Sequence, residues 1–123
     1  MSINKQLNAP YDQDNVFAKI LAGEIPNNTV YEDEVFLAFH DITPAAPVHI
    51  VIIPKVSGLR SPRDLEDNPE LAGQLVSVAA KIASQENLDS GYRLIMNCGE
   101  HAGQSAPHVH MHILGGGTLG PLG

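Results

Sequence analysis

The clearest pattern in the chain is a strict alternation of polar and apolar residues near its C-terminal end. Three histidines alternate there with three apolar residues: His108, Val109, His110, Met111, His112 and Ile113. Such period-two alternation is typical of a β-strand with one polar and one buried face, on which alternate side chains lie about 6.5 Å apart. We therefore expect a strand that presents three imidazoles on one side and packs apolar side chains into a core on the other.

Four further segments have the apolar and β-branched residues of strands. They are residues 29–32, 35–41, 48–53 and 92–97. The first two flank a tight acidic turn at Asp33 and Glu34, and the third ends at Pro54. With the histidine segment they predict a sheet of about five strands.

Two segments have the spacing of amphipathic helices. Asn15 can cap a short helix that ends near Gly23, and its apolar positions are Val16, Phe17, Ile20 and Leu21. Asn68 can cap a long helix with Pro69 at its first position, running to about Glu86. The apolar stripe of that helix is Leu71, Leu75, Val76, Ala79, Ile82 and Ala83.

The chain of 123 residues has the length of one domain. Residues 1–14 are polar and without periodicity, so we expect a flexible N-terminal tail. Residues 15–123 contain no internal repeat and no linker, and we expect them to form a single domain.

Charge and composition restrict the partners. The chain has 14 acidic and 7 basic residues, a net charge of −7, which argues against a nucleic acid but allows a small phosphorylated ligand. No apolar run approaches the length of a membrane span, and the N-terminus lacks a signal-peptide core. Cys98 is the only cysteine, so we expect no intrachain disulfide, as in a reducing compartment. Together these features lead us to expect a cytoplasmic protein without membrane contact.

Two chemistries suit the three histidines. With His49 as an additional ligand they could bind zinc, although the strand spreads them over about 13 Å and contains no carboxylate to orient them. Alternatively, His110 could attack a phosphoryl group while its neighbours orient it or relay protons. Gln104 and Ser105 lie just upstream, and Gly103 would let the backbone approach a phosphate closely.

The same residues resemble a known family. The run from His108 to Leu114 is similar to the His-φ-His-φ-His-φ-φ signature of the histidine triad (HIT) superfamily, where φ is an apolar residue. Segments resembling its HINT branch are 15–20, 23–26, 37–44, 49–55, 91–93 and Asn97. The resemblance covers residues 15–117 and is specific.

The resemblance implies an α+β, HIT-like fold: an antiparallel sheet of about five strands with one long and one short helix, dimerising into a continuous sheet. It also implies a hydrolase that cleaves the P–N bond of purine nucleoside 5′-phosphoramidates (AMP amidates) through a covalent nucleotidyl-histidine, without metal or other cofactor. A dinucleoside polyphosphate hydrolase or nucleotidylyltransferase of the same superfamily remains open, as does a nucleotide-binding scaffold with vestigial activity.

Carried over residue by residue, the resemblance makes His110 the nucleophile. The assisting catalytic residues are His49, His108, His112 and Ser105. Asp41 would bind the ribose hydroxyls, and the other nucleotide contacts would be Phe17, Ile20 and Ile42 at the base and Asn97, Gly103, Gln104, Ser105, His110 and His112 at the phosphate. Two features depart from the family: Pro107 replaces a larger side chain, and residues 118–123 lack a tryptophan. The first would reshape the edge of the site, and the second bears on the preference for leaving group.

Overall fold

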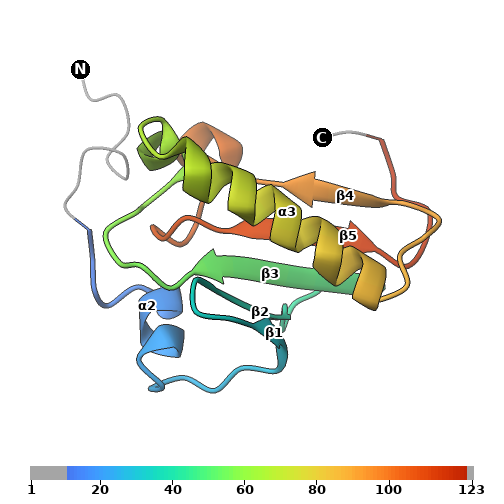
Figure 1. Ribbon diagram of the computed structural model, residues 1–123, viewed down its shortest axis with the longest axis horizontal. Helices are drawn as coiled ribbons and strands as arrows, with labels where there is room; N and C mark the ends of the chain where they lie inside the picture. The colour runs from blue at the N-terminus through green and yellow to red at the C-terminus, as the bar shows by residue number, and fades with distance from the viewer. Residues whose placement is uncertain (1–10, 122–123) are drawn as a thin grey trace.

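Five antiparallel strands form one sheet in this computed structural model, which describes residues 11–121. They are β1 (Thr29–Glu32), β2 (Phe36–His40), β3 (Val48–Pro54), β4 (Tyr92–Ile95) and β5 (Met111–Gly115). Their spatial order is β1-β2-β3-β5-β4, so β1 and β4 are the edges (Figure 1). The predicted α+β class and the number and direction of the strands are confirmed.

Helix α3 (Pro69–Gln85) covers one face of the sheet (Figure 1). Apolar side chains from the helix and the sheet form the main core, among them Leu75, Ala79, Ile82, Ile50, Ile52, Val109, Met111 and Ile113. One residue of the predicted stripe is wrong: Val76 is 51% exposed, whereas Val78 is buried. Val78 follows Leu75 by three residues and precedes Ile82 by four, which places it on their side of the helix.

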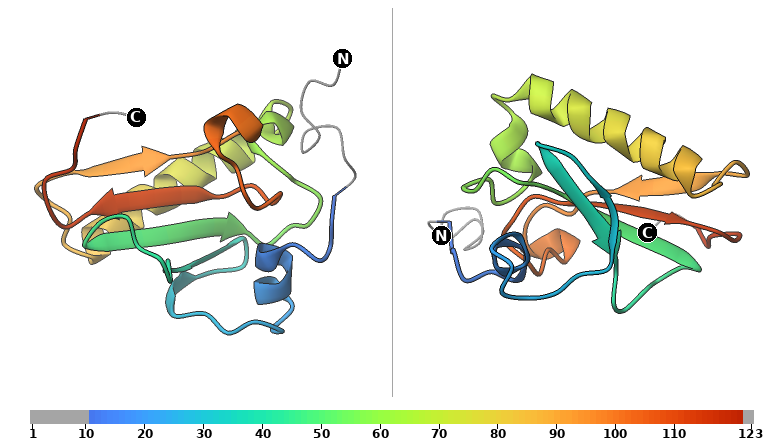
Figure 2. Two further views of the ribbon diagram at one scale, coloured as in Figure 1. Left: turned by 180° about the vertical axis from the view of Figure 1, so that it is seen from behind. Right: turned by 60° about the horizontal axis from the view of Figure 1, so that its bottom comes forward.

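A smaller core lies on the opposite face, beneath α2 (Val16–Leu21). Its buried residues are Ile20, Leu37, Phe39, Val51 and Ile53. Asn15 caps α2 as predicted, since its Oδ1 accepts a hydrogen bond from Ala18 N at 2.9 Å. Figure 2 shows that α2 lies at one end of this face, so a large part of the sheet has no helix over it.

The histidine strand begins later than the alternation predicts. β5 starts at Met111, which pairs with Ile52, and residues 108–110 lie outside the ladder. Pro54 lacks an N–H and cannot extend β3 toward them. Val109 N instead donates to Leu59 O at 2.9 Å, while Val109 still packs in the main core. The alternation of sides therefore persists although the regular strand does not.

Several other boundaries differ from the expected ones. β4 ends at Ile95 rather than at residue 97. Two short 3-10 helices, η1 (Pro62–Leu65) and η2 (Glu100–Ala102), occupy segments for which no periodicity is apparent.

No helix in the described part of the chain is long and apolar enough to cross a membrane. The predicted tail, residues 1–14, lies mostly outside the described residues, so its separation from a domain over 15–123 stays a prediction.

Candidate active site

Four histidines lie on the sheet face that α3 leaves uncovered. His49 projects from β3 and His112 from β5, and their ring centroids are 5.0 Å apart. The His110 ring is also 5.0 Å from the His112 ring and almost perpendicular to it. The His110 and His112 rings are therefore closer than the roughly 6.5 Å that separates alternate side chains along a flat strand.

A main-chain carbonyl determines where His110 carries its proton. His110 Nδ1 lies 2.7 Å from the carbonyl oxygen of His108, which can only accept, so Nδ1 must donate. Burial lowers the pKa of His110, against the opposing effect of this hydrogen bond, and the ring is only 4% exposed. A neutral ring with its proton on Nδ1 has a free lone pair on Nε2, which is the form that a nucleophile needs.

A second chain of hydrogen bonds fixes the protons of His49 and His112. Ala45 N donates to His49 Nδ1 at 3.0 Å, so neutral His49 carries its proton on Nε2. That nitrogen lies 2.8 Å from His112 Nδ1, which therefore accepts, and the His112 proton is on Nε2. Burial lowers the pKa of His49, and burial together with the neighbouring rings lowers the pKa of His112 to about 4. His112 thus presents an N–H donor beside the His110 lone pair.

His108 is the most buried of the four, with no exposed surface. Its Nε2 donates to the carbonyl oxygen of Pro54 at 3.0 Å, and its Nδ1 accepts from the hydroxyl of Tyr11 at 2.5 Å. Protein groups occupy both ring nitrogens. The His108 carbonyl bonds His110 Nδ1, so His108 acts on that ring through its main chain.

An apolar pocket of about 220 Å³ lies next to the histidines. The predicted Phe17, Ile20, Ile42 and Asp41 all line it. The Phe17 ring is 4.8 Å from the His110 ring, and Ile42 is 95% exposed at the rim. Other lining residues were not predicted as site residues, among them Ile25, Phe39 and Val51. The alternation of the two predicted strands could have revealed the last two, because position 51 shares a face with His49.

The loop after β4 holds the remaining predicted residues. Asn97 Nδ2 donates to Ala102 O at 2.9 Å, and Gly103 has a φ of 76°, the left-handed region that favours glycine. Gln104 is buried, and its amide bonds the main chain at Gly99, Arg60 and Ala106. The Gln104 side chain thus shapes the loop itself, whereas Ser105 beside it is exposed.

One group of described residues has the composition of a metal site: Asp41, His49 and His112, whose ligand atoms lie within 4.8 Å of one another. Their hydrogen bonds do not suit a metal. A metal on His49 Nε2 would force its proton onto Nδ1, against the N–H of Ala45. The 2.8 Å between His49 Nε2 and His112 Nδ1 is also shorter than the roughly 3.3 Å that two tetrahedral zinc ligands require. As arranged here these residues form a proton-ordered chain, and His49 would have to give up its Nε2 proton before that atom could bind a metal.

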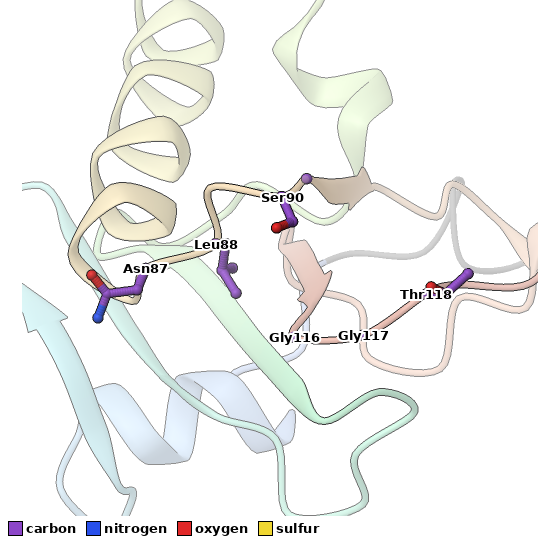
Figure 3. Close-up of a pocket in the computed structure, with 7 residues that line it drawn as sticks. Asn87, Leu88, Ser90, Gly116, Gly117 and Thr118 are labelled. Carbon is purple, nitrogen blue, oxygen red and sulfur yellow. The ribbon is translucent and has the colours of Figure 1, made fainter.

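A pocket of about 370 Å³ lies just beyond the C-terminal end of β5 (Figure 3). It is lined by Asn87, Leu88, Ser90, Gly91, Gly116, Gly117 and Thr118. These residues include no histidine, carboxylate or cation. Although it is larger than the apolar pocket, it lacks the groups that acid–base or nucleophilic chemistry at phosphorus requires.

The fold and the histidine cluster together define a member of the HIT domain family. Residues 22–119 match the model of that family, and the chain belongs to it. It is 47% identical over 112 residues to the purine nucleoside phosphoramidase of Escherichia coli (strain K12), covering 89% of this chain and 93% of that protein. It is 49% identical over 107 residues to a 14 kDa zinc-binding protein of Zea mays, covering 85% of this chain and 84% of that protein.

A solved structure agrees with the sequence relatives. The HIT family hydrolase from Clostridium thermocellum superposes with a TM-score of 0.82 at 42% identity, covering 90% of this chain and 97% of that chain. The protein is therefore an enzyme, a hydrolase of the HIT family. The maize relative is named for binding zinc, whereas in this chain the hydrogen bonds of His49 place a proton on the nitrogen that would bind a metal.

Proposed function

We propose that this hydrolase cleaves the P–N bond of purine nucleoside 5′-phosphoramidates through a nucleotide bound covalently to His110. The observation that carries the proposal is the proton order of the site. His110 offers a lone pair on Nε2, and His112 beside it offers an N–H. An apolar pocket that includes the Asp41 carboxylate adjoins them. The name of the Escherichia coli relative, a purine nucleoside phosphoramidase, supports the same substrate class.

The reaction proceeds in two displacements at the α-phosphorus. His110 Nε2 attacks phosphorus and the P–N bond breaks. The bonding pair stays on the amine nitrogen, which takes up a proton from solvent as it leaves. The His112 N–H donates to a phosphate oxygen and stabilises the charge of the transition state. Water then attacks the same phosphorus, the bond between phosphorus and His110 Nε2 breaks, and AMP is released while the proton of the water passes to solvent. Throughout, the His108 carbonyl holds Nδ1–H and supports the positive charge of the nucleotidylated ring.

The nucleoside contacts follow from the apolar pocket. A purine ring packs against Phe17 and Ile20, with Ile42 closing over it from the rim. The Asp41 carboxylate accepts hydrogen bonds from the ribose hydroxyls. Asn97 and Ser105 contact phosphate oxygens, and the open backbone at Gly103 lets the phosphate approach.

A substrate panel on the purified protein tests the proposal. An adenosine 5′-phosphoramidate with a fluorogenic amine is compared with a diadenosine polyphosphate and with AMP binding. Turnover of the amidate alone is expected. Preference for the polyphosphate would assign the chain to the dinucleoside polyphosphate hydrolases, and AMP binding without turnover of either compound would indicate a nucleotide-binding scaffold. Varying the amine also tests Pro107, which changes the edge of the site.

Replacing Asp41 with asparagine should lower kcat/KM for ribonucleotides more than kcat/KM for their 2′,3′-dideoxy analogues. A hydrogen bond to a charged acceptor contributes about 1.5–3 kcal/mol, so specificity for the ribose should fall about 10- to 100-fold. The asparagine keeps one carbonyl oxygen to accept from Thr43 N, as Asp41 Oδ1 does at 2.8 Å. The ratio of kcat/KM values for the two substrates measures the effect. An equal loss on both substrates would make Asp41 a structural residue.

Exhaustive chelation should leave activity unchanged, and the purified protein should carry no stoichiometric zinc. The reason is the proton on His49 Nε2, which occupies the position that a metal would need. Activity after treatment with EDTA and elemental analysis of the same sample provide the measurement. Loss of turnover with EDTA and its recovery with zinc would reverse the assignment of the site to metal-free chemistry.

We also propose a homodimer in which two sheets join at β4. This strand is an edge of the sheet, and an unpaired edge favours pairing with another chain. The buried apolar side of α3 packs in the chain's own core and does not contribute to this interface. Tyr92 on β4, which is 40% exposed, is available instead. Light scattering should give about twice the chain mass of 13.2 kDa, and a strict monomer at micromolar concentration would refute pairing.

A cytoplasmic location completes the proposal. A single cysteine provides no intrachain disulfide, as expected for a reducing compartment. The acidic balance gives no reason to expect a nucleic acid as partner.

A further inference from the structure

Tyr11 lies 97 residues before His108 in the sequence, yet its hydroxyl bonds the histidine ring. The two rings are 5.7 Å apart in an edge-to-face arrangement. Because the Pro54 carbonyl can only accept, His108 carries its proton on Nε2. Its Nδ1 therefore accepts, and the Tyr11 hydroxyl must be the donor.

A turn fixes Tyr11 relative to the nucleoside pocket. Asn15 donates to the carbonyl oxygen of Asp12 from both N, at 3.2 Å, and Nδ2, at 2.6 Å. Asp14 N donates to Asp12 Oδ1 at 2.8 Å. Since Asn15 also caps α2, the residue that follows Tyr11 is linked to the helix that carries Phe17.

Tyr11 is connected to His110, the proposed nucleophile, through His108. Tyr11 and Pro54 hold the His108 ring at both nitrogens, and the carbonyl oxygen of His108 receives the proton of His110 Nδ1. His108 has no exposed surface, so water could not replace a lost partner without rearrangement. Phe17 reinforces the arrangement, because its ring lies 6.3 Å from His108 and 4.8 Å from His110.

We propose that Tyr11 is a positioning residue of the active site: its hydroxyl fixes the His108 ring and, through the His108 carbonyl, the orientation of the His110 imidazole. This inference rests on the proposed function only in making His110 the nucleophile. Tyr11 need not touch the substrate. Its effect is on how often His110 Nε2 points at phosphorus, and therefore on kcat rather than on binding.

The test compares Tyr11→Phe with a matched control, Tyr31→Phe. The first change keeps the ring and removes only the hydroxyl that bonds His108. The second also removes one tyrosine hydrogen bond, the 2.7 Å contact with Asp33 Oδ2. Tyr31 packs against the α3 core, on the other side of the sheet from the histidines. Any general cost of losing such a hydrogen bond is therefore common to both variants.

Two measurements follow, one with substrate and one without. With the AMP amidate, Tyr11→Phe should lower kcat on the order of 10-fold and change KM by less than about 2-fold, since a small misplacement of a reacting group affects the chemical step. Nitrogen-15 NMR of the free protein should show the His108 Nδ1 resonance moving downfield, as a ring nitrogen does when it loses a donor. The His110 Nδ1–H proton should shift as well. Tyr31→Phe should change none of these.

The outcomes separate this inference from the proposed function. A wild-type protein that turns over no amidate refutes the proposed function, while the two NMR signals still decide whether Tyr11 positions the rings. An unmoved His108 signal in Tyr11→Phe would overturn the contact. A moved His108 signal with an unchanged His110 proton and unchanged kcat would overturn the positioning role.

Discussion

His110→Ala should remove nearly all turnover of an AMP amidate and leave AMP binding largely intact. The loss should be on the order of 10³-fold or more, because the variant has no group that can form the covalent intermediate. Binding should persist, since the apolar pocket and Asp41 are separate from the His110 ring nitrogens. Steady-state kinetics and calorimetric titration with AMP measure the two effects.

The covalent intermediate gives this prediction its direct test. Rapid quenching of the wild-type protein with an AMP amidate, followed by mass spectrometry, should find one AMP per chain on the peptide that contains His110. His110→Gly should regain part of the activity when imidazole is added. Variants of His112 should lose less than His110→Ala, because that residue donates a hydrogen bond and does not form the bond to phosphorus. An adduct on Ser105, or substantial turnover by His110→Ala, would identify a different nucleophile.

Acidification from pH 7 to pH 5 should lower the free energy of unfolding. Burial lowers the pKa of His49, His108, His110 and His112, the last to about 4. Below the ordinary histidine value near 6.5 the unfolded chain takes up protons that the folded chain does not, so the free energy of unfolding falls with pH until the lowered values are reached. Between pH 7 and pH 5, His112 alone should cost about 1 kcal/mol after a discount for its partial exposure, and the other three add to that loss.

Urea unfolding at pH 7, 6 and 5 measures this dependence. The comparison uses the slope of the unfolding free energy with pH, because replacing a buried histidine also changes the stability at every pH. His112→Gln should make the slope shallower by removing one titrating group. His101, exposed in η2, provides the matched control, and His101→Gln should leave the slope unchanged. A wild-type stability that is constant over this range would mean that these histidines take up protons at the same pH in the folded protein as in the unfolded chain.

The local patterns of the sequence predicted much of the architecture. Runs of apolar and β-branched residues located four strands, and period-two alternation located the histidine segment. Asn15 caps its helix with the expected hydrogen bond. At two of the boundaries that moved, a single local group is responsible. Asp33 Oδ1 accepts from Val35 N and Phe36 N, which binds the turn before β2. Pro54 prevents the ladder from reaching His108.

The site was predictable where it depends on faces and unpredictable where it depends on distant contacts. His49 and His112 share a face because both strands alternate, and the sequence contains that information. The contact of Tyr11 with His108 joins a segment without periodicity to a residue 97 positions away. Gln104 was predicted to contact the ligand, and its amide bonds the main chain of its own loop. The sequence pattern gives no sign of these hydrogen bonds, which only the three-dimensional structure reveals.

Two peptide groups fix the ring protons of the site. The N–H of Ala45 keeps the proton of His49 on Nε2, and the carbonyl of His108 keeps the proton of His110 on Nδ1. Every amino acid supplies the carbonyl, and every one except proline supplies the N–H. Substitution at these two positions therefore leaves the donor and acceptor in place. Residues around the pocket can diverge toward other nucleosides, and Pro107 toward other leaving groups, while His110 keeps its lone pair. The chemistry of the site is therefore separable from its selectivity in evolution.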